Sequence, residues 1–248
     1  TAFAAENPAE VFDRVMEKNN TIQSAEIQSG VHSVILAKDV IPDGQMKVDM
    51  AMHAEMDMQD TTDLKYLAQV ASSILGQDSY SQVFYTDGYY YVDANGVKLK
   101  YPMPLEQIIS SVQTGVNTSN MESSYMKGIS LNEVNGKRVL AYEANPKKLN
   151  KNVKEALGTV MNTLGTDVNL DMNIQEMKGA YVLDDNDYII YMTNYIVYNM
   201  EVLDQPMTCI TLMETEVQNP GEPVVVTLPS TDGYEDLIGL YDGVIESE

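Results

Sequence analysis

The chain is poor in cysteine, histidine and basic residues, and it contains no tryptophan. Cys209 stands alone, so no disulfide can form within the chain and no zinc site of several cysteines can exist. In a strand context a lone cysteine is most simply a small buried apolar residue. No stretch approaches about 18 consecutive apolar residues, so the sequence predicts no membrane-spanning helix.

Positive charge is scarce. The 248 residues include 15 Lys and Arg against 37 Asp and Glu, which gives a formal net charge of -22. Such a surface repels nucleic acid and anionic lipid headgroups, so we expect no nucleic-acid partner. The hydrophobic fraction of 44% suits a folded protein with a sizeable core rather than a disordered chain.

A long alternating run lies between Gly44 and Gln59. Its apolar positions are Met46, Val48, Met50, Met52, Ala54, Met56 and Met58. A period of two sends these side chains to one face of a strand. Methionine is unbranched and polarizable, and it suits an irregular or changing contact surface. The run therefore predicts a strand with one apolar face, and it favours binding over catalysis.

Three segments have the apolar spacing of amphipathic helices. The first begins at Asn7 and Pro8, which suit the N-cap and the first helical position, and extends to about Asn19. The second opens in the same way at Asn145 and Pro146 and runs to Leu164. The third is short and follows Pro104, with its apolar face at residues 105–112.

The remaining segments alternate as strands. Asp-Gly and Asn-Gly pairs at residues 87–88, 95–96 and 135–136 are strong hairpin signals. We expect strands over residues 22–38, 45–59, 65–75, 83–86, 89–93, 97–101, 129–134, 137–144, 168–175, 188–203 and 207–217. A helix is the alternative for residues 65–75, where Leu64, Leu67 and Ala71 could share one face, but the alternation there favours a strand.

Consecutive hairpins interrupted by amphipathic helices predict an α+β fold. We expect one long, strongly curved antiparallel sheet, a half-open β-barrel, with helices covering its concave face. The helix of residues 146–164 should lie across the methionine face, because its apolar stripe, which includes Val153 and Leu157, must be buried. The whole chain, 1–248, is expected to form a single domain. The repeated Asn-Pro helix starts indicate two structurally similar halves, about 1–103 and 104–248.

Some residues carry a resemblance to a known group. They are the run Tyr85 to Tyr91, the following Gly96 to Lys100, and the closing residues 219–222, 226–229 and 233–234. The chain resembles uncharacterised lipoproteins of Gram-positive Firmicutes that are grouped with the lipoprotein carrier (LolA) and mycobacterial lipoprotein (LppX, LprG) folds. The resemblance implies a LolA-like domain with a helical lid and export behind a signal peptide. It also implies a lipid-modified cysteine upstream of Thr1, which would anchor the protein to the outer face of the cell membrane.

Together these features predict an exported, non-catalytic binding protein for a lipid or other hydrophobic ligand, without a cofactor or metal. We expect a monomer that meets the membrane only through the upstream lipid anchor. The candidate residues of an apolar cavity are Met46, Met50, Met52, Met56, Met58, Met172, Met192, Met200, Val153 and Leu157. The methionine face could equally be ordinary core beneath the helices.

An alternative is a structural or adhesive surface module that contacts other proteins. The orientation of the tyrosines distinguishes the two, because a large exposed apolar patch usually marks a partner surface. The residues whose exposure tests this alternative are Tyr89, Tyr91, Tyr195 and Tyr198.

Other motifs have simpler explanations. Ser124 and Lys127 match the Ser-x-x-Lys spacing of penicillin-binding enzymes, but the partner motifs are absent. His32 and His53 have no histidine or cysteine at ligand spacing, so both are expected to be surface residues. The acidic residues 184–187 could bind calcium weakly, but they lack the pattern of a calcium loop, and a hairpin turn explains them.

Overall fold

The computed structural model describes residues 6–38, 40–60, 62–108, 121–151, 172–202 and 205–237. Helix α1 spans Pro8–Asn20, and residues 105–108 and 146–151 are also helical. Short 3-10 turns lie at Pro42–Gly44 (η1) and Ser123–Tyr125 (η2). The strands are β1 (Ser24–Leu36), β2 (Gln45–Asp57), β3 (Lys65–Ile74), β4 (Gln77–Thr86), β5 (Tyr89–Ala94), β6 (Val97–Pro102), β7 (Met126–Val134), β8 (Lys137–Ala144), β9 (Asn173–Leu183), β10 (Ile189–Val202), β11 (Gln205–Gln218) and β12 (Glu235–Asp236).

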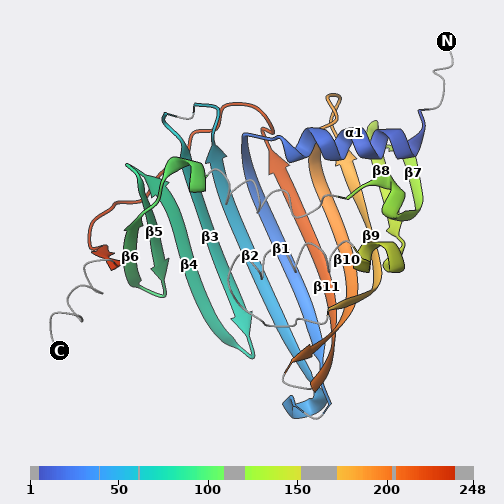
Figure 1. The fold of residues 1–248 in the computed structure, drawn as a ribbon, viewed down its shortest axis with the longest axis horizontal. Helices are drawn as coiled ribbons and strands as arrows, with labels where there is room; N and C mark the ends of the chain where they lie inside the picture. Colours follow the sequence, from blue (N-terminus) through green and yellow to red (C-terminus); the bar gives the residue numbers. More distant parts are fainter. Residues whose placement is uncertain are drawn as a thin grey trace. The chain divides into compact units, whose positions relative to one another are not determined.

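Within the described residues, hydrogen bonds link the twelve strands in the order β12-β6-β5-β4-β3-β2-β1-β11-β10-β9-β8-β7 (Figure 1). The edge strands β12 and β7 are not joined, so these strands do not close into a barrel. The expectation of an open sheet is therefore confirmed. The expectation of a purely antiparallel sheet is wrong, because the short β12 pairs with β6 in parallel.

Most expected elements are present. Asn7 caps α1, accepting a hydrogen bond from the backbone N–H of Ala9 at 3.1 Å. Residues 65–74 form strand β3, as the alternation indicated. Strand β4 begins at Gln77, well before the expected residue 83. Residues 224–228, which follow the last long strand, are not part of any strand.

Two-residue turns explain why three hairpins were predicted correctly from the sequence and why the start of β4 was not. Asp87-Gly88, Asn95-Gly96 and Asn135-Gly136 each have positive φ at both residues, as a type I′ turn requires. Leu75 and Gly76 have the same backbone conformation, with φ of 52° and 74°. Leucine is rare at such a position, so the sequence does not mark this fourth turn.

Contacts divide the chain into two compact units. Unit 1 comprises residues 1–17, 30–49 and 121–215, and unit 2 comprises residues 18–29, 50–120 and 216–248. Strands β1, β2 and β11 contribute to both.

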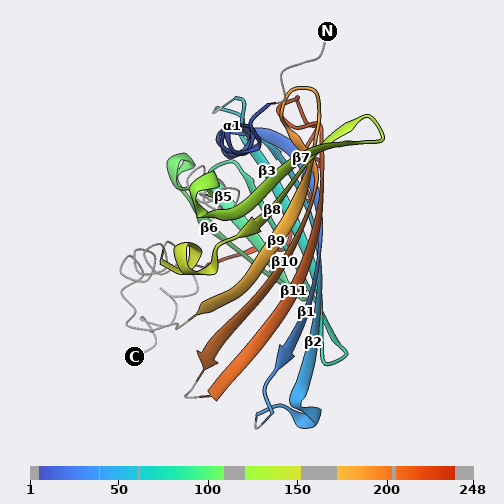
Figure 2. The same cartoon turned by 90° about the vertical axis from the view of Figure 1, so that its right-hand side faces the viewer.

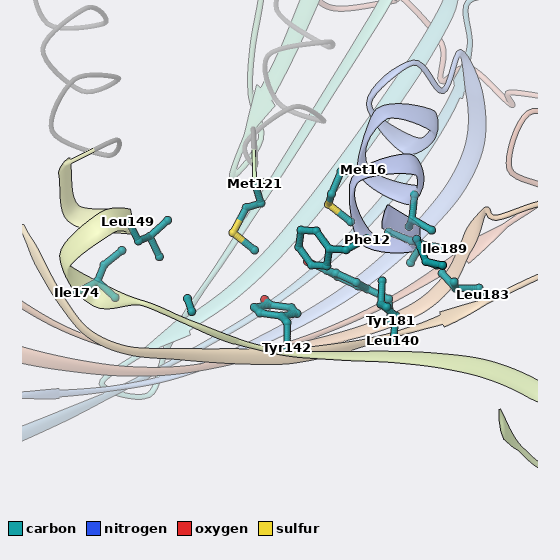
Figure 3. Close-up of a cluster of buried hydrophobic side chains, with 13 residues drawn as sticks. Phe12, Met16, Met121, Leu140, Tyr142, Leu149, Ile174, Tyr181, Leu183 and Ile189 are labelled. Carbon is teal, nitrogen blue, oxygen red and sulfur yellow. The ribbon is translucent and has the colours of Figure 1, made fainter. Parts of the chain in front are cut away.

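In unit 1, α1 packs against one face of β8, β9 and β10 (Figures 2 and 3). Its apolar stripe of Val11, Phe12, Val15 and Met16 is buried. The ring of Phe12 meets Tyr142 edge-on, with centroids 5.8 Å apart. Three further methionines, Met126, Met177 and Met192, pack against the same cluster. The helix is therefore held mainly by burial of its apolar side.

A glycine makes room for a buried polar pair beneath α1. Gly179 lies opposite Tyr142 on β8 and opposite Asn194 on β10. The Tyr142 hydroxyl donates to Asn194 Oδ1, and both side chains are buried. Burial and the neighbouring Tyr181 raise the pKa of Tyr142, so its hydroxyl stays protonated and able to donate.

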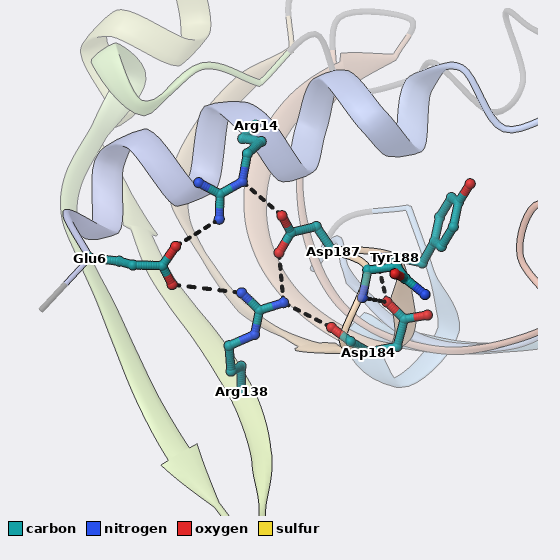
Figure 4. A network of polar contacts seen from close by, with 7 residues as sticks. Glu6, Arg14, Arg138, Asp184, Asp187 and Tyr188 are labelled. Atoms are coloured by element: carbon teal, nitrogen blue, oxygen red, sulfur yellow. Dashed lines mark hydrogen bonds and ion pairs between the residues drawn. The ribbon is translucent and has the colours of Figure 1, made fainter. Parts of the chain in front are cut away.

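Four charged residues tie α1 to the strands of unit 1 (Figure 4). Asp187, in the β9–β10 turn, accepts from Arg14 Nε and Arg138 Nη2, each at 2.7 Å. Glu6 lies 3.0 Å from Arg14 Nη2 and 3.7 Å from Arg138 Nη1. Burial by itself raises the pKa of Asp187, but hydrogen bonds from the two arginines outweigh it and leave that pKa below its usual value.

Replacing Asp187 with asparagine is expected to destabilise the protein by about 1–2 kcal/mol at neutral pH. Because the folded-state pKa is lowered, this contribution is present above the unfolded value of about 3.9 and is lost as pH falls through the folded value. The free energies of unfolding of the unaltered protein and Asp187→Asn, measured with urea, should therefore differ at pH 7 and converge near pH 2. Glu133→Gln, at an exposed carboxylate of β7, is the control and should have little effect at either pH.

In unit 2, the C-terminal segment of residues 221–234 covers one face of β3, β4 and β5. Phe84 stacks on Tyr91 with ring centroids 4.6 Å apart, and Tyr234 meets both rings edge-on. Lys98 Nζ lies 5.4 Å from the centroid of Tyr234. This cluster is an apolar core of unit 2.

Candidate functional site

The two faces of unit 2 can be told apart by what the C-terminal segment touches. The backbone N–H of Val224 donates to Asp57 Oδ2 at 3.2 Å, and that of Thr227 donates to Glu55 Oε2 at 3.0 Å. The odd-numbered positions of β2 therefore share a face with the Phe84 cluster. Because side chains alternate along a strand, the even-numbered methionines of β2 lie on the opposite face.

Four tyrosines share that opposite face of unit 2. Strand register places Tyr66 opposite Tyr85, Tyr85 opposite Tyr90, and Tyr90 opposite Tyr101. The four rings thus form one row across β3 to β6, at right angles to the strands. We call the surface that joins this row to the methionines of β2 the Met–Tyr face. Its members are Met50, Met52, Met56, Met58, Tyr66, Tyr85, Tyr90 and Tyr101.

The tyrosine row combines apolar rings with polar tips. Tyr66, Tyr90 and Tyr101 are half-buried, whereas Tyr85 is buried and donates from its hydroxyl to the Met103 carbonyl at 3.3 Å. The rings of Tyr90 and Tyr101 lie 5.4 Å apart. Burial, followed by the neighbouring Tyr66 and Tyr101, raises the pKa of Tyr90 to about 12. Its hydroxyl is therefore neutral at physiological pH and can donate or accept a hydrogen bond.

The methionines of this face become more buried along β2. Met50 is exposed, Met52 is half-buried, and Met56 and Met58, the residue after the end of β2, are buried. The Met–Tyr face thus grades from packed core to partly accessible surface. Flexible methionine side chains next to half-buried tyrosines can adjust to apolar groups of varied shape.

The other predicted site residues belong to unit 1 or lie outside the described residues. Met192 packs against the cluster beneath α1, and Met46 and Met172 are half-buried. The sulfur of half-buried Met200 lies 3.7 Å from Cys209 Sγ, and Cys209 is buried, as expected. Val153 and Leu157, with most of the expected helix of residues 146–164, lie outside the described residues.

The alternating sequence pattern predicts the methionines of this face but not the tyrosine row. The signal was available, because two-residue turns at Asp87-Gly88 and Asn95-Gly96 fix the strand register. That register places Tyr85 opposite Tyr90 and Tyr90 opposite Tyr101. The register of Tyr66 depends on the Leu75-Gly76 turn, which the sequence does not mark because leucine is rare at that position.

The remaining motifs form no catalytic or metal site in the part of the chain that the structure describes. Ser124 Oγ donates to Glu122 and Lys127 Nζ donates to Glu143, so these two side chains pair elsewhere rather than with each other. His32 and His53 lie beside carboxylates. No described group of three or more His, Cys, Asp and Glu side chains is arranged to hold a metal ion.

The acidic run of residues 184–187 forms a hairpin turn, as expected, and Asp184 stabilises it. Its Oδ1 accepts from the backbone N–H groups of Asn186 and Tyr188 at 2.8 and 2.9 Å. No helix among the described residues is long and apolar enough to cross a membrane.

The described fold defines an α+β protein built on one large open sheet with few helices. The chain belongs to a family of unknown function, DUF6612, whose model matches residues 7–229. No curated protein matches the chain.

Several solved structures are distantly similar, including the following three. LprF from Mycobacterium bovis is 10% identical, with 91% of this chain and 100% of that chain covered and a TM-score of 0.36. The lipoprotein LppX from Mycobacterium tuberculosis is 10% identical, with 90% and 100% covered and a TM-score of 0.37. A β-barrel-like protein of the domain of unknown function DUF1849 from Brucella abortus is 11% identical, with 78% and 98% covered and a TM-score of 0.25. These likenesses are too distant to transfer a function.

Proposed function

We propose that this protein is a non-catalytic binding protein for a lipid or other hydrophobic molecule, held on the Met–Tyr face of unit 2. The observation that carries the proposal is the row of half-buried tyrosines in register beside the methionines of β2. An ordinary core would bury all of these side chains, whereas Met52, Tyr66, Tyr90 and Tyr101 keep part of their surface accessible.

The chemistry of the face favours an amphipathic ligand. Apolar parts of the ligand would lie against the methionines and the tyrosine rings, and its polar groups would bond to the tyrosine hydroxyls. Neutral hydroxyls can match either a donor or an acceptor. The net charge of -22 disfavours a strongly anionic ligand.

The same proposal includes the location, membrane anchor, oligomeric state and cavity residues expected from the sequence. We place the protein outside the cytoplasm, attached by a lipid anchor upstream of Thr1, as the resemblance to exported lipoproteins implies. The proposal also includes helices covering the concave face of a curved sheet, and a monomeric state. It keeps the other candidate residues of the apolar cavity, which are Met46, Met172, Met192, Met200, Val153 and Leu157. No cofactor or metal is needed, because the proposed activity is binding alone.

The adhesive alternative depends on exposed tyrosines. Tyr91 is buried, and Tyr89, Tyr195 and Tyr198 are half-buried. Lys178 lies over the ring of Tyr195 at 5.0 Å, and Lys100 lies over that of Tyr89 at 5.2 Å. These four residues therefore provide no exposed tyrosine patch of the kind that this alternative requires.

Replacing Met52 with aspartate is expected to weaken ligand binding about tenfold or more, because a charge on the Met–Tyr face must be desolvated when an apolar molecule covers it. Binding can be measured by titration with the neutral fluorescent probe N-phenyl-1-naphthylamine, and by native mass spectrometry of gently purified protein. Ala51→Asp is the matched control: it adds the same charge at the neighbouring, exposed position on the other face of β2 and should leave binding unchanged.

Thermal unfolding of both variants shows whether each remains folded. If Met52→Asp unfolds, the neutral Met52→Gln replaces it, with a smaller loss of binding expected. Equal probe affinity in folded Met52 and Ala51 variants, or no binding of probe or co-purified lipid by the unaltered protein, would rule out the proposed site.

A further inference from the structure

The β3–β4 hairpin of unit 2 ends in exposed apolar side chains. Leu75 is 67% exposed, and Ile74 and Tyr80 are each 42% exposed. Figure 1 shows this hairpin extending beyond the neighbouring β5–β6 turn. Every residue from Ile74 to Tyr80 is exposed. Tyr80 joins the hairpin to the β5–β6 turn, because its backbone N–H donates to Asn95 Oδ1 at 2.8 Å and its carbonyl accepts from the backbone N–H of Asn95 at 2.9 Å. We call residues 74–80 the hairpin tip.

Leu75 occupies a position where leucine is unfavourable. The equivalent residue in the three comparable turns is Asp87, Asn95 or Asn135, with φ between 51° and 53°. Aspartate and asparagine tolerate this left-handed conformation, whereas a leucine there costs roughly 1–2 kcal/mol. An exposed leucine at this place therefore does not stabilise the folded chain. A contact with another molecule explains its presence better than folding stability does.

The hairpin tip is also poor in charge, although the chain as a whole is strongly acidic. Asp78 is the one charged residue between Tyr66 and Thr86. By contrast, Val134 at the β7–β8 turn is 51% exposed but lies between Glu133 and, beyond the turn, Lys137. The β3–β4 tip thus combines aliphatic groups, one tyrosine, neutral serine and glutamine side chains and the single charge of Asp78.

We propose that the hairpin tip docks on the surface of a zwitterionic lipid bilayer, with Leu75 and Ile74 in contact with the upper acyl chains. Tyrosine is the residue type that favours the level of the headgroups, and Tyr80 lies a few residues behind the turn. The apolar end of the tip can enter such an interface with Asp78 left among the headgroups, whereas the chain's net charge of -22 opposes binding to anionic lipid.

The backbone of the tip suits an apolar surface. The ladder of β3 and β4 continues to the last pair, Ile74 and Gln77, so the turn presents few unpaired backbone groups. Ser72 and Ser79, just behind it, share a hydrogen bond of 2.6 Å between their hydroxyls.

The size of the tip favours a membrane over a protein partner. A stable protein interface typically needs about 20–30 residues on each side, and the tip offers a few. Contact with a bilayer needs no such area, because each side chain that leaves water contributes separately. The tip would hold this end of the β3–β4 hairpin at the lipid surface.

The absence of tryptophan from the chain allows a direct test. In Leu75→Trp the single indole should shift its emission to shorter wavelength when phosphatidylcholine vesicles are added. Val134→Trp, at the turn of another hairpin, is the matched control and should show no shift. Leu75→Asn should remain folded with an equal or higher melting temperature, because asparagine accepts the backbone conformation, yet co-sediment with vesicles about tenfold less.

Three outcomes would overturn the inference. One is a Leu75→Trp emission that vesicles leave unchanged. Another is Leu75→Asn that co-sediments as well as the unaltered protein. The third is vesicle-independent self-association of the unaltered protein that Leu75→Asn abolishes in analytical ultracentrifugation, which would assign the tip to a protein contact.

Discussion

Replacing Phe12 with alanine is expected to lower the free energy of unfolding by about 3–5 kcal/mol, the usual cost of truncating a buried phenylalanine. The Phe12 side chain is fully buried, and its ring lies 5.8 Å from that of Tyr142 and 6.2 Å from that of Tyr181. Its loss removes a buried contact between α1 and the strands of unit 1. Urea unfolding followed by circular dichroism measures the effect.

Two comparisons make the Phe12 prediction specific. Phe12→Leu keeps most of the volume and should cost far less than the alanine variant. Hydrogen exchange of the Phe12→Ala protein should show the largest loss of protection in α1, because tertiary packing rather than intrinsic propensity stabilises a 13-residue helix. A change below about 1 kcal/mol would mean that α1 is not packed on the strands of unit 1 as described.

Replacing Gly179 with alanine is expected to destabilise the protein by about 3 kcal/mol, the upper part of the range for overpacking a core. A Cβ atom at this position would lie 2.7 Å from Asn194 Oδ1 and 2.8 Å from the Tyr142 hydroxyl, and closer still to the carbonyl oxygen of Thr193. The backbone oxygen belongs to the paired strand β10 and cannot move without disturbing the ladder. The methyl group would also separate the buried hydroxyl from its acceptor.

Gly128→Ala is the matched control for the Gly179 prediction. Gly128 lies on the edge strand β7, and a Cβ atom there would meet nothing within 4 Å. Alanine at Gly128 should be neutral or slightly stabilising, since it restricts the unfolded chain. Similar free energies of unfolding for the two variants would show that the close approach at Gly179 is wrong. Asn194→Ala provides an independent measure of the buried hydrogen bond and should also be destabilising.

Local sequence signals predicted most of the secondary structure. Alternation identified β2 and β3, because a period of two leaves one face apolar whatever the strand pairs with. The Asn7-Pro8 start and the buried stripe of α1 were equally clear, because capping and helical periodicity are local properties. Gly-containing turns with Asp or Asn located three hairpins for the same reason. The start of β4 was missed because its turn depends on a leucine that such rules do not favour.

The sites needed information that no short window contains. The ion pairs of Asp187 with Arg14 join residues 173 positions apart, and the pairing of Thr227 with Glu55 spans 172 positions. Neither could be foreseen, because the chain has 37 Asp and Glu residues and any of these carboxylates could have been the partner of Arg14. The same holds for the parallel pairing of β12 with β6, which depends on where the C-terminal segment packs.

The sequence by itself determined which residues form strands, which side of each strand is apolar, and that methionine and tyrosine supply much of that apolar surface. These properties follow from alternation, turn residues and composition, all of which act over a few residues. The tertiary structure decided which apolar side becomes core and which remains partly open. In unit 2 the C-terminal segment covers the Phe84 face, while the even-numbered methionines of β2 and the tyrosine row share the other face. Burial depends on what packs above a strand, and that partner comes from a distant part of the chain.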